Sequence, residues 1–206
     1  MINQHPSYKR VVNAVQNGAR YLDIGSCFGQ DLRKLISDGV PTDNTFVIEK
    51  EQGFLSAATD FFGDADRPPA KFICADVLDT SNADMNALLG TVDIIHVSMV
   101  LHVWDWNDQI RACERMVAFL KPQKGSLILG RLVGRLTACH WRGPAGKPMF
   151  KHNVESFHKL WAEVGRRTGT EWEVRAEFAG AFGSQNGGQH WEDPATRRLM
   201  FEVERL

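Results

Sequence analysis

The feature that most constrains the fold of this chain is a regular alternation of short apolar runs with longer amphipathic stretches. From residue 21 to about residue 165, runs of strand length are separated by segments of helical periodicity. This alternation is typical of a parallel sheet whose strands are joined by right-handed helical crossovers. The expected elements are strand 21–24, helix 30–37, strand 45–49, helix 51–62, strand 71–75, strand 92–98, a helix capped by Asn107, strand 126–131 and a helix capped by Asn153.

The C-terminal part departs from this alternation. Strands 172–178 and 199–203 follow one another without a helix between them, so we expect them to pair as an antiparallel hairpin. We therefore predict an α/β fold with a seven-stranded, mostly parallel sheet that ends in this hairpin. The 206 residues show no composition break or repeat, which predicts a single domain over 1–206 with a short N-terminal segment.

Composition excludes several classes of function. The chain has 24 basic and 25 acidic residues, interspersed, with a formal net charge of −1, so nucleic acid is not an expected partner. No apolar run approaches the roughly 20 residues that span a bilayer, and residues 1–20 lack the apolar stretch of a signal peptide. We therefore expect no membrane association and a cytoplasmic protein. The four cysteines lie far apart without metal-ligand spacing, which predicts reduced thiols and no metal site.

A glycine-bounded turn follows the first expected strand. Gly25 permits a tight turn, and Gly29 lets the next helix begin close to a ligand. Backbone N–H groups and the helix N-terminus there could hold a carboxylate. Alone the motif is weak, because two glycines also occur in strand-to-helix turns that bind nothing. The candidate residues of this turn are Asp23, Gly25, Ser26, Phe28, Gly29 and Gln30.

Acidic residues end the next two expected strands. Glu49 closes the second strand, about 20 residues after Gly29, where a carboxylate can accept both hydroxyl protons of a ribose. Asp76 follows the third strand and is placed to accept from an adenine amino group, while Val77 packs on the ring. This succession predicts an adenosine cofactor. A nicotinamide dinucleotide fits less well, because Cys27 interrupts the glycine pattern that a diphosphate needs.

At these residues the sequence resembles a known family. The run 21–33 is similar to motif I of fungal class I methyltransferases of secondary metabolism, and more narrowly to those that esterify a carboxyl group in meroterpenoid pathways. Further matches lie at 92–96, 101–102, 106, 125–131, 152–153, 155–157 and 160–161. The resemblance implies a Rossmann-like class I methyltransferase fold, S-adenosylmethionine as cofactor and a carboxylic acid or phenol as acceptor.

Two departures from the family's pattern are visible. Members usually carry a longer N-terminal segment that covers the cofactor and the substrate, whereas this chain has about 20 residues before its first strand. Ser26 stands where a cysteine is common. We expect the first departure to affect the choice of substrate and methyl transfer itself, and the second to be mild.

Residues after the fourth strand are expected to meet both reactants. Val97 and Ser98 should adjoin the methionine part of the cofactor, and His102 is the candidate catalytic residue, with a core or helix-capping role as its alternative. A carboxylate acceptor is already ionised and needs no base, whereas a phenol gains from one. Arg131 could grip a carboxylate in two hydrogen bonds, and loop 180–191 could act as a lid. The candidate acceptor contacts are Trp104, Trp106, Arg131, His152, His190 and Trp191, each with an alternative as core or surface residue.

The preferred reading of the sequence is therefore an O-methyltransferase that takes its methyl group from S-adenosylmethionine and acts on a carboxylate or phenol of a small natural product. We also expect a two-fold homodimer. The alternatives are a protein of this fold that catalyses an isomerisation or cyclisation, a non-catalytic partner subunit, and a nicotinamide enzyme.

Overall fold

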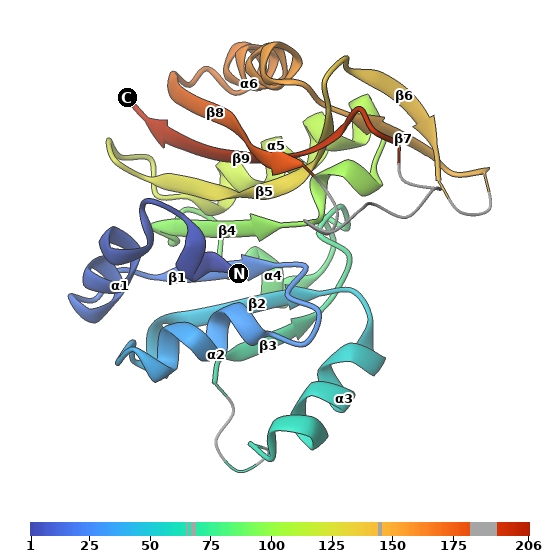
Figure 1. The fold of residues 1–206 in the computed structure, drawn as a ribbon. Coiled ribbons are helices and arrows are strands. Elements are labelled where there is room, and N and C mark those ends of the chain that lie inside the picture. Colours follow the sequence, from blue (N-terminus) through green and yellow to red (C-terminus); the bar gives the residue numbers. More distant parts are fainter. Residues whose placement is uncertain (65, 67–68, 144–145, 182–192) are drawn as a thin grey trace.

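The computed structural model describes residues 1–64, 66, 69–143, 146–181 and 193–206. They form a seven-stranded sheet in the order β3-β2-β1-β4-β5-β9-β8, with helices packed on both faces (Figure 1). The parallel strands are β1 (Tyr21–Ile24), β2 (Thr45–Glu49), β3 (Lys71–Cys74), β4 (Ile94–Ser98) and β5 (Leu127–Arg135). β9 (Thr196–Arg205) pairs antiparallel with both β5 and β8 (Trp172–Ala181). The predicted sheet and its C-terminal hairpin are confirmed.

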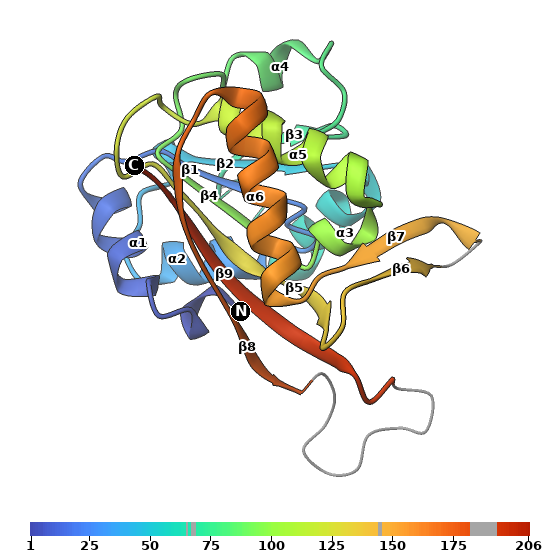
Figure 2. The same cartoon turned by 90° about the horizontal axis from the view of Figure 1, so that it is seen from above.

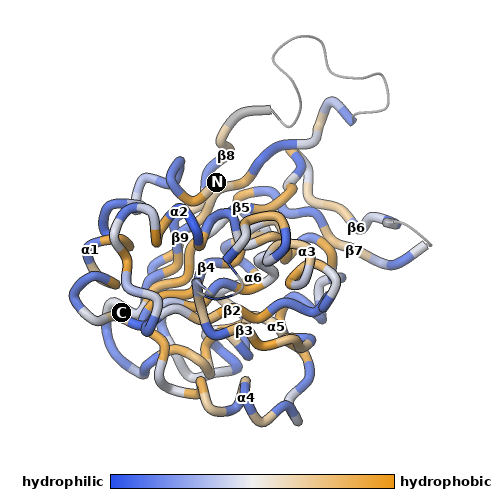
Figure 3. The backbone as a smooth tube through the Cα atoms, turned by 90° about the horizontal axis from the view of Figure 1, so that it is seen from below, coloured by the Kyte–Doolittle hydropathy of each residue, from blue (hydrophilic) through white to orange (hydrophobic). Residues whose placement is uncertain are grey.

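Two apolar layers hold the helices against the sheet. On one face the core includes residues of α5 (Trp106–Phe119), α6 (Val154–Thr168) and the short α4 (Ala83–Asn86). On the other face it includes residues of α1 (Tyr8–Gln16), α2 (Gln30–Ser37) and α3 (Gln52–Phe62). Both views show the sheet between these sets of helices (Figures 1 and 2). Figure 3 shows hydrophobic residues gathered on the inner strands, as expected for strands covered on both faces, which are largely apolar.

Helix caps explain where the two long helices begin. Asn153 caps α6 as predicted, because its side chain accepts from the Ser156 N–H while the Ser156 hydroxyl accepts from the Asn153 N–H. The predicted cap at Asn107 is wrong. Asp105 caps α5 instead, its Oδ1 accepting from the Asp108 N–H at 2.9 Å, and a carboxylate is favoured there by the helix dipole.

The structure adds elements that the sequence did not predict. α1 precedes the first strand, together with the short 3-10 helix η1 (Ile2–Gln4). Further 3-10 turns are η2 (Thr42–Asn44) and η3 (Leu101–Val103). After β5 a separate two-stranded hairpin forms from β6 (Cys139–Arg142) and β7 (Pro148–Lys151) and projects from the body of the molecule (Figure 2). Lys151 lies over the Trp141 ring at 4.0 Å, a cation–π contact within this hairpin.

The topology fixes where a ligand can bind. β1 lies between β2 and β4. After β1 the chain adds β2 and β3 on one side of β1, and it then returns to add β4 and β5 on the opposite side, so the strand order reverses at β1. In sheets of this type ligands bind beyond the carboxyl ends of the strands at that reversal. In the described residues no helix has the length and apolar character to cross a membrane.

Candidate functional site

A cavity of about 380 Å³ lies at the carboxyl ends of β1, β2, β3 and β4, and we call it the β1–β4 cavity. It lies at the position that the topology selects, and its lining includes residues at the ends of β1 and β2 and residues that directly follow β3 and β4. Its lining comprises Ile24, Gly25, Cys27, Ile48, Glu49, Lys50, Glu51, Phe54, Ala75, Asp76, Val77, Met99, Val100, Val103, Trp104 and Lys147.

The glycine turn is one wall of this cavity and is tightly packed. Gly25 has φ +69°, and a Cβ there would lie 2.3 Å from Cγ2 of Val100. The missing side chain is therefore what lets the turn after β1 meet the chain leaving β4. Gly29, with φ +64°, is the N-cap of α2, a left-handed conformation that glycine adopts without steric cost.

Backbone strain is concentrated at the same cavity. In the part of the chain that the structure describes, the non-glycine residues with positive φ are Cys27, at +53°, and Met99, at +62°, and both line the cavity. Each is held by a hydrogen bond from its own N–H: Cys27 to Glu49 Oε2 at 2.8 Å, and Met99 to the Arg131 carbonyl at 2.7 Å. Such conformations persist where the surroundings enforce them, and they cluster at functional sites.

Glu49 ends β2 with its carboxylate in the cavity wall and only 6% of the residue exposed. Oε2 accepts from the Cys27 N–H, and Oε1 accepts from the Glu51 N–H at 3.0 Å. These bonds orient the carboxylate, and each oxygen retains capacity for a second hydrogen bond. The arrangement suits an acceptor for vicinal hydroxyl groups.

Asp76 comes after β3 and lines the same cavity as Glu49. Its Oδ2 accepts from Lys50 Nζ at 3.0 Å, and its Oδ1 accepts from the Leu78 N–H at 3.0 Å. Burial acts to raise the pKa of Asp76, but these two hydrogen bonds and the lysine charge together lower it. The carboxylate is therefore ionised and an acceptor. Lys50 was not predicted as a site residue, because an exposed lysine after a strand has no distinctive sequence signal.

Apolar groups complete the wall next to the two acids. Val77 is 5% exposed and Phe54, on the first turn of α3, is 41% exposed. The Phe54 ring packs against Phe28 with centroids 5.9 Å apart. Val77 and Phe54 both line the cavity and give it an apolar wall. Phe28 and Val77 were candidates from the sequence. Phe54 was not, because an apolar residue in an amphipathic helix is expected to lie in the core.

Asp23 lies on the other face of the sheet, in a buried charged group. His96 Nδ1 is 2.9 Å from Asp23 Oδ1, and Asp31 accepts from the Ile2 N–H at 2.9 Å. Burial acts to lower the pKa of His96, yet the charges of Asp23 and Asp31 raise it. These contacts link β1 to β4 and α2 to the N-terminal residues, so they hold these elements together on that face of the sheet.

The remaining cofactor candidates lie around the turn and the end of β4. The Ser26 hydroxyl is buried and has no hydrogen-bond partner in the described chain. Gln30 is exposed at the start of α2, and Val97 is fully buried in the core. Ser98 lines a second cavity on the far side of the β4 end.

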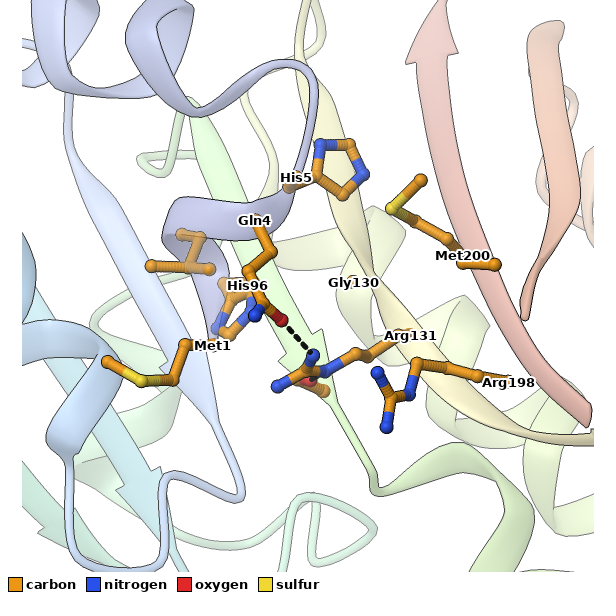
Figure 4. Close-up of a pocket in the computed structure, with 11 residues that line it drawn as sticks. Met1, Gln4, His5, His96, Gly130, Arg131, Arg198 and Met200 are labelled. Atoms are coloured by element: carbon orange, nitrogen blue, oxygen red, sulfur yellow. Dashed lines mark hydrogen bonds between the residues drawn. The ribbon is translucent and has the colours of Figure 1, made fainter. Parts of the chain in front are cut away.

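We call this second cavity, also about 380 Å³, the β4–β9 cavity. Its lining includes two arginines and the N-terminal residues: Arg131, Arg198, Met1, Ile2, Gln4 and His5 (Figure 4). Arg131 extends from β5 into it and donates to Ser98 Oγ at 3.3 Å and to Gln4 Oε1 at 3.2 Å. Ser98 therefore borders this cavity, while Met99 and Val100, next in the chain, border the β1–β4 cavity.

Two acceptor candidates pack within the protein: His152 is fully buried, and Trp106 is partly buried against the core. His152 has no exposed surface; its Nδ1 is 2.9 Å from Ser156 Oγ and its Nε2 is 2.9 Å from Gln109 Oε1. Burial lowers the pKa of His152 to about 3, so the ring is neutral. Trp106 packs edge-on against Phe150, with centroids 5.1 Å apart. Both ring nitrogens of His152 thus have partners within the protein, which leaves neither of them for an acceptor in this structure.

The other candidates are placed as follows. Trp104 lines the β1–β4 cavity. His102 is in the lining of neither cavity; its Nδ1 accepts from the Val133 N–H at 3.3 Å, and burial, with a smaller effect of Lys151, lowers its pKa to about 4. His190 and Trp191 lie outside the described residues. Among the described residues, no group of three or more His, Cys, Asp and Glu side chains could hold a metal ion.

Sequence relatives of this chain are fungal enzymes. It is 35% identical over 212 residues to the O-methyltransferase phiE of a fungal species, which covers 96% of this chain and 70% of phiE. It is 34% identical to the O-methyltransferase atr3 of Stereocaulon alpinum, over 100% of this chain and 59% of atr3. It is 37% identical to the methyltransferase adrK of Penicillium rubens, over 84% of this chain and 63% of adrK. The chain thus spans between 59% and 70% of these relatives' lengths. No family model matches it.

Solved structures share the fold at low sequence identity. The CMeT domain of the citrinin polyketide synthase superposes with a TM-score of 0.66 at 15% identity, over 98% of this chain and 51% of that chain. An S-adenosylmethionine-dependent methyltransferase from Mesorhizobium loti gives 0.62 at 13% identity over the whole of both chains. The cyclase SpnF gives 0.63 at 16% identity, over 96% of this chain and 80% of that chain. Because one fold carries several chemistries here, fold similarity alone does not select the reaction.

Proposed function

This chain belongs to the family of fungal secondary-metabolite O-methyltransferases that includes phiE and atr3, and we propose that it transfers the methyl group of S-adenosylmethionine to an oxygen of a small natural product. The acceptor is a carboxylate or a phenol. The observation that carries the proposal is the β1–β4 cavity, where a glycine turn and two carboxylates follow three neighbouring strands.

The residues of this cavity fit an adenosyl group. Glu49 would accept from the ribose hydroxyls, because each of its oxygens has one hydrogen bond to a backbone N–H and capacity for another. Asp76 would accept from the adenine amino group, with Val77 and Phe54 as apolar walls for the purine. The turn at Gly25 and the N-terminus of α2 would hold the methionine carboxylate. The buried Ser26 hydroxyl lacks a hydrogen-bond partner in the described chain, and it would donate to the same carboxylate.

The bound cofactor would supply an electrophilic methyl group, so the protein's main task is to place an acceptor oxygen in line with it. Positioning of this kind can contribute an effective molarity of roughly 10⁵ M or more. A carboxylate acceptor then needs no proton transfer, because it is ionised at neutral pH.

A phenol acceptor would call for a base, and His102 is the candidate. Its Nδ1 already accepts from the Val133 N–H, and the lowered pKa keeps the ring neutral, so the proton sits on Nε2. The ring nitrogen that remains is then a donor and not a base. This arrangement favours the carboxylate over the phenol.

Methyl transfer is tested with S-adenosylmethionine that carries a tritiated methyl group and a panel of aromatic and terpenoid acids and phenols. We expect label in at least one acidic acceptor, released by mild alkali as methanol when the product is a methyl ester. An absence of label across the panel, in protein that binds S-adenosylhomocysteine, would favour a reaction other than methylation. Turnover that does not depend on the methyl donor would support the isomerase or cyclase alternative.

A further inference from the structure

The β4–β9 cavity has two cationic side chains where the sheet passes from parallel to antiparallel pairing. Arg131 comes from β5 and Arg198 from β9, and both line the cavity. Their strands are hydrogen-bonded neighbours, with Arg131 opposite Met200 and Val133 opposite Arg198. Two register positions apart on one face, the side chains extend to the same side of the cavity, as Figure 4 shows.

Arg131 is held in position by neutral partners. Nε donates to Ser98 Oγ at 3.3 Å and Nη1 to Gln4 Oε1 at 3.2 Å. A guanidinium has five N–H donors, so these bonds leave donors on Nη1 and Nη2 for another acceptor. Burial lowers the pKa of Arg131, and the nearby Arg198 charge lowers it further. A pair of partly buried like charges is stabilised when an anion lies between them.

The position of this pair relates it to the reaction. Ser98, to which Arg131 donates, lines the β4–β9 cavity, and the next residues, Met99 and Val100, line the β1–β4 cavity. The two cavities therefore flank the end of β4. An anion held by the arginines would therefore lie next to the strand end that also borders the proposed cofactor cavity.

We propose that Arg131 and Arg198 form a two-arginine clamp that binds the carboxylate of the acceptor, with Arg198 as a specificity-determining residue. Gln4 fixes the orientation of Arg131. This inference rests on the proposed function. In the reaction, one carboxylate oxygen bonds to the methyl carbon as the sulfur–methyl bond breaks, and the products are a methyl ester and S-adenosylhomocysteine. The bond-breaking electron pair stays on sulfur, and no proton moves.

The matched control for Arg198 is its neighbour Arg197. That residue is also on β9, but its guanidinium donates to the carbonyls of Pro194 and Thr196. Arg197→Gln removes the same charge from the same strand while the clamp stays intact. Arg198→Lys keeps the charge but loses the two-pronged geometry of a guanidinium.

A binding measurement tests the clamp without turnover. Calorimetry in the presence of S-adenosylhomocysteine would compare 1-naphthoate with its neutral analogue 1-naphthamide. We expect the wild type to prefer naphthoate, and Arg131→Gln and Arg198→Gln each to weaken naphthoate binding by about 10- to 100-fold. Arg198→Lys should be intermediate and Arg197→Gln unchanged. Equal binding of the acid and the amide by the wild type, or binding of neither, would overturn the clamp.

A kinetic measurement then separates the clamp from the proposed function. With an accepted acid, Arg198→Gln should raise KM by about 10- to 100-fold and leave the affinity for S-adenosylhomocysteine unchanged. An equal effect of Arg197→Gln and Arg198→Gln would contradict the clamp while methylation stood. Selective naphthoate binding with no labelled methyl transfer to any acid would contradict the proposed function while the clamp stood.

Discussion

Adding a single methyl group at Gly25 is expected to destabilise the protein by about 2–5 kcal/mol. Alanine at φ +69° would occupy the left-handed region, at a cost of about 1–2 kcal/mol. Its Cβ would also lie 2.3 Å from Val100 Cγ2, well inside contact distance, and overpacking of this kind costs about 1–3 kcal/mol. Urea unfolding of Gly25→Ala at constant pH measures the sum.

A double-mutant cycle separates the two contributions. Val100→Ala removes the clashing atoms and should by itself cost about 1 kcal/mol, since the side chain is half-buried. In the double variant the overpacking disappears and the left-handed strain remains, so the coupling free energy should be about 1–3 kcal/mol in the favourable direction. Gly63→Ala is the control for the left-handed strain alone, because Gly63 has φ +63° and no atom lies within 4 Å of the added Cβ. Additive losses, within about 0.5 kcal/mol, would refute the close packing of these two loops.

Two further predictions concern histidines. His102→Ala should leave methyl-ester formation within about threefold of wild type, whereas a phenol methylator would slow by about 100-fold or more; alkali-labile and alkali-stable label from a hydroxybenzoic acid distinguish the two products. The pKa of His152 is lowered to about 3 by burial, below the unfolded value of 6.5, so its contribution to stability is complete above pH 6.5 and is lost as the pH falls toward 3. Between pH 7 and pH 5 the free energy of unfolding should therefore fall less in His152→Gln than in the wild type, by up to about 1.4 kcal/mol per pH unit. An identical fall in the two proteins would contradict the assignment.

The sheet and the β1–β4 cavity could be predicted from the sequence, the sheet from local patterns and the place of the cavity from the topology that those patterns imply. Strands covered on both faces are largely apolar, and β2 is an example, since all of its residues are buried and the central three, 46–48, are apolar. The site follows from topology, because residues after parallel strands meet at one edge. Gly25, Glu49, Asp76 and Val77 were predicted in this way, and all four line the β1–β4 cavity.

Features that depend on partners far apart in the chain were not accessible. His152 is bonded to Gln109, 43 residues away, and the sequence of either residue alone is equally compatible with a role in the site. Lys147 reaches the cavity only because the unpredicted β6–β7 hairpin places it there. Arg198 was missed because the predicted strand began one residue later, at 199, whereas β9 begins at Thr196.

The central claim is that an adenosyl group lies across the ends of β1, β2 and β3, and calorimetric titration with S-adenosylhomocysteine tests it most directly. We predict one site per chain in the wild type, affinity reduced about 10- to 100-fold in Glu49→Gln through hydrogen bonds lost to a buried ligand, and wild-type affinity in Glu51→Gln, whose side chain is exposed at the same cavity. Wild-type protein that binds no S-adenosylhomocysteine, or a Glu49→Gln variant that binds it as the wild type does, would contradict the account.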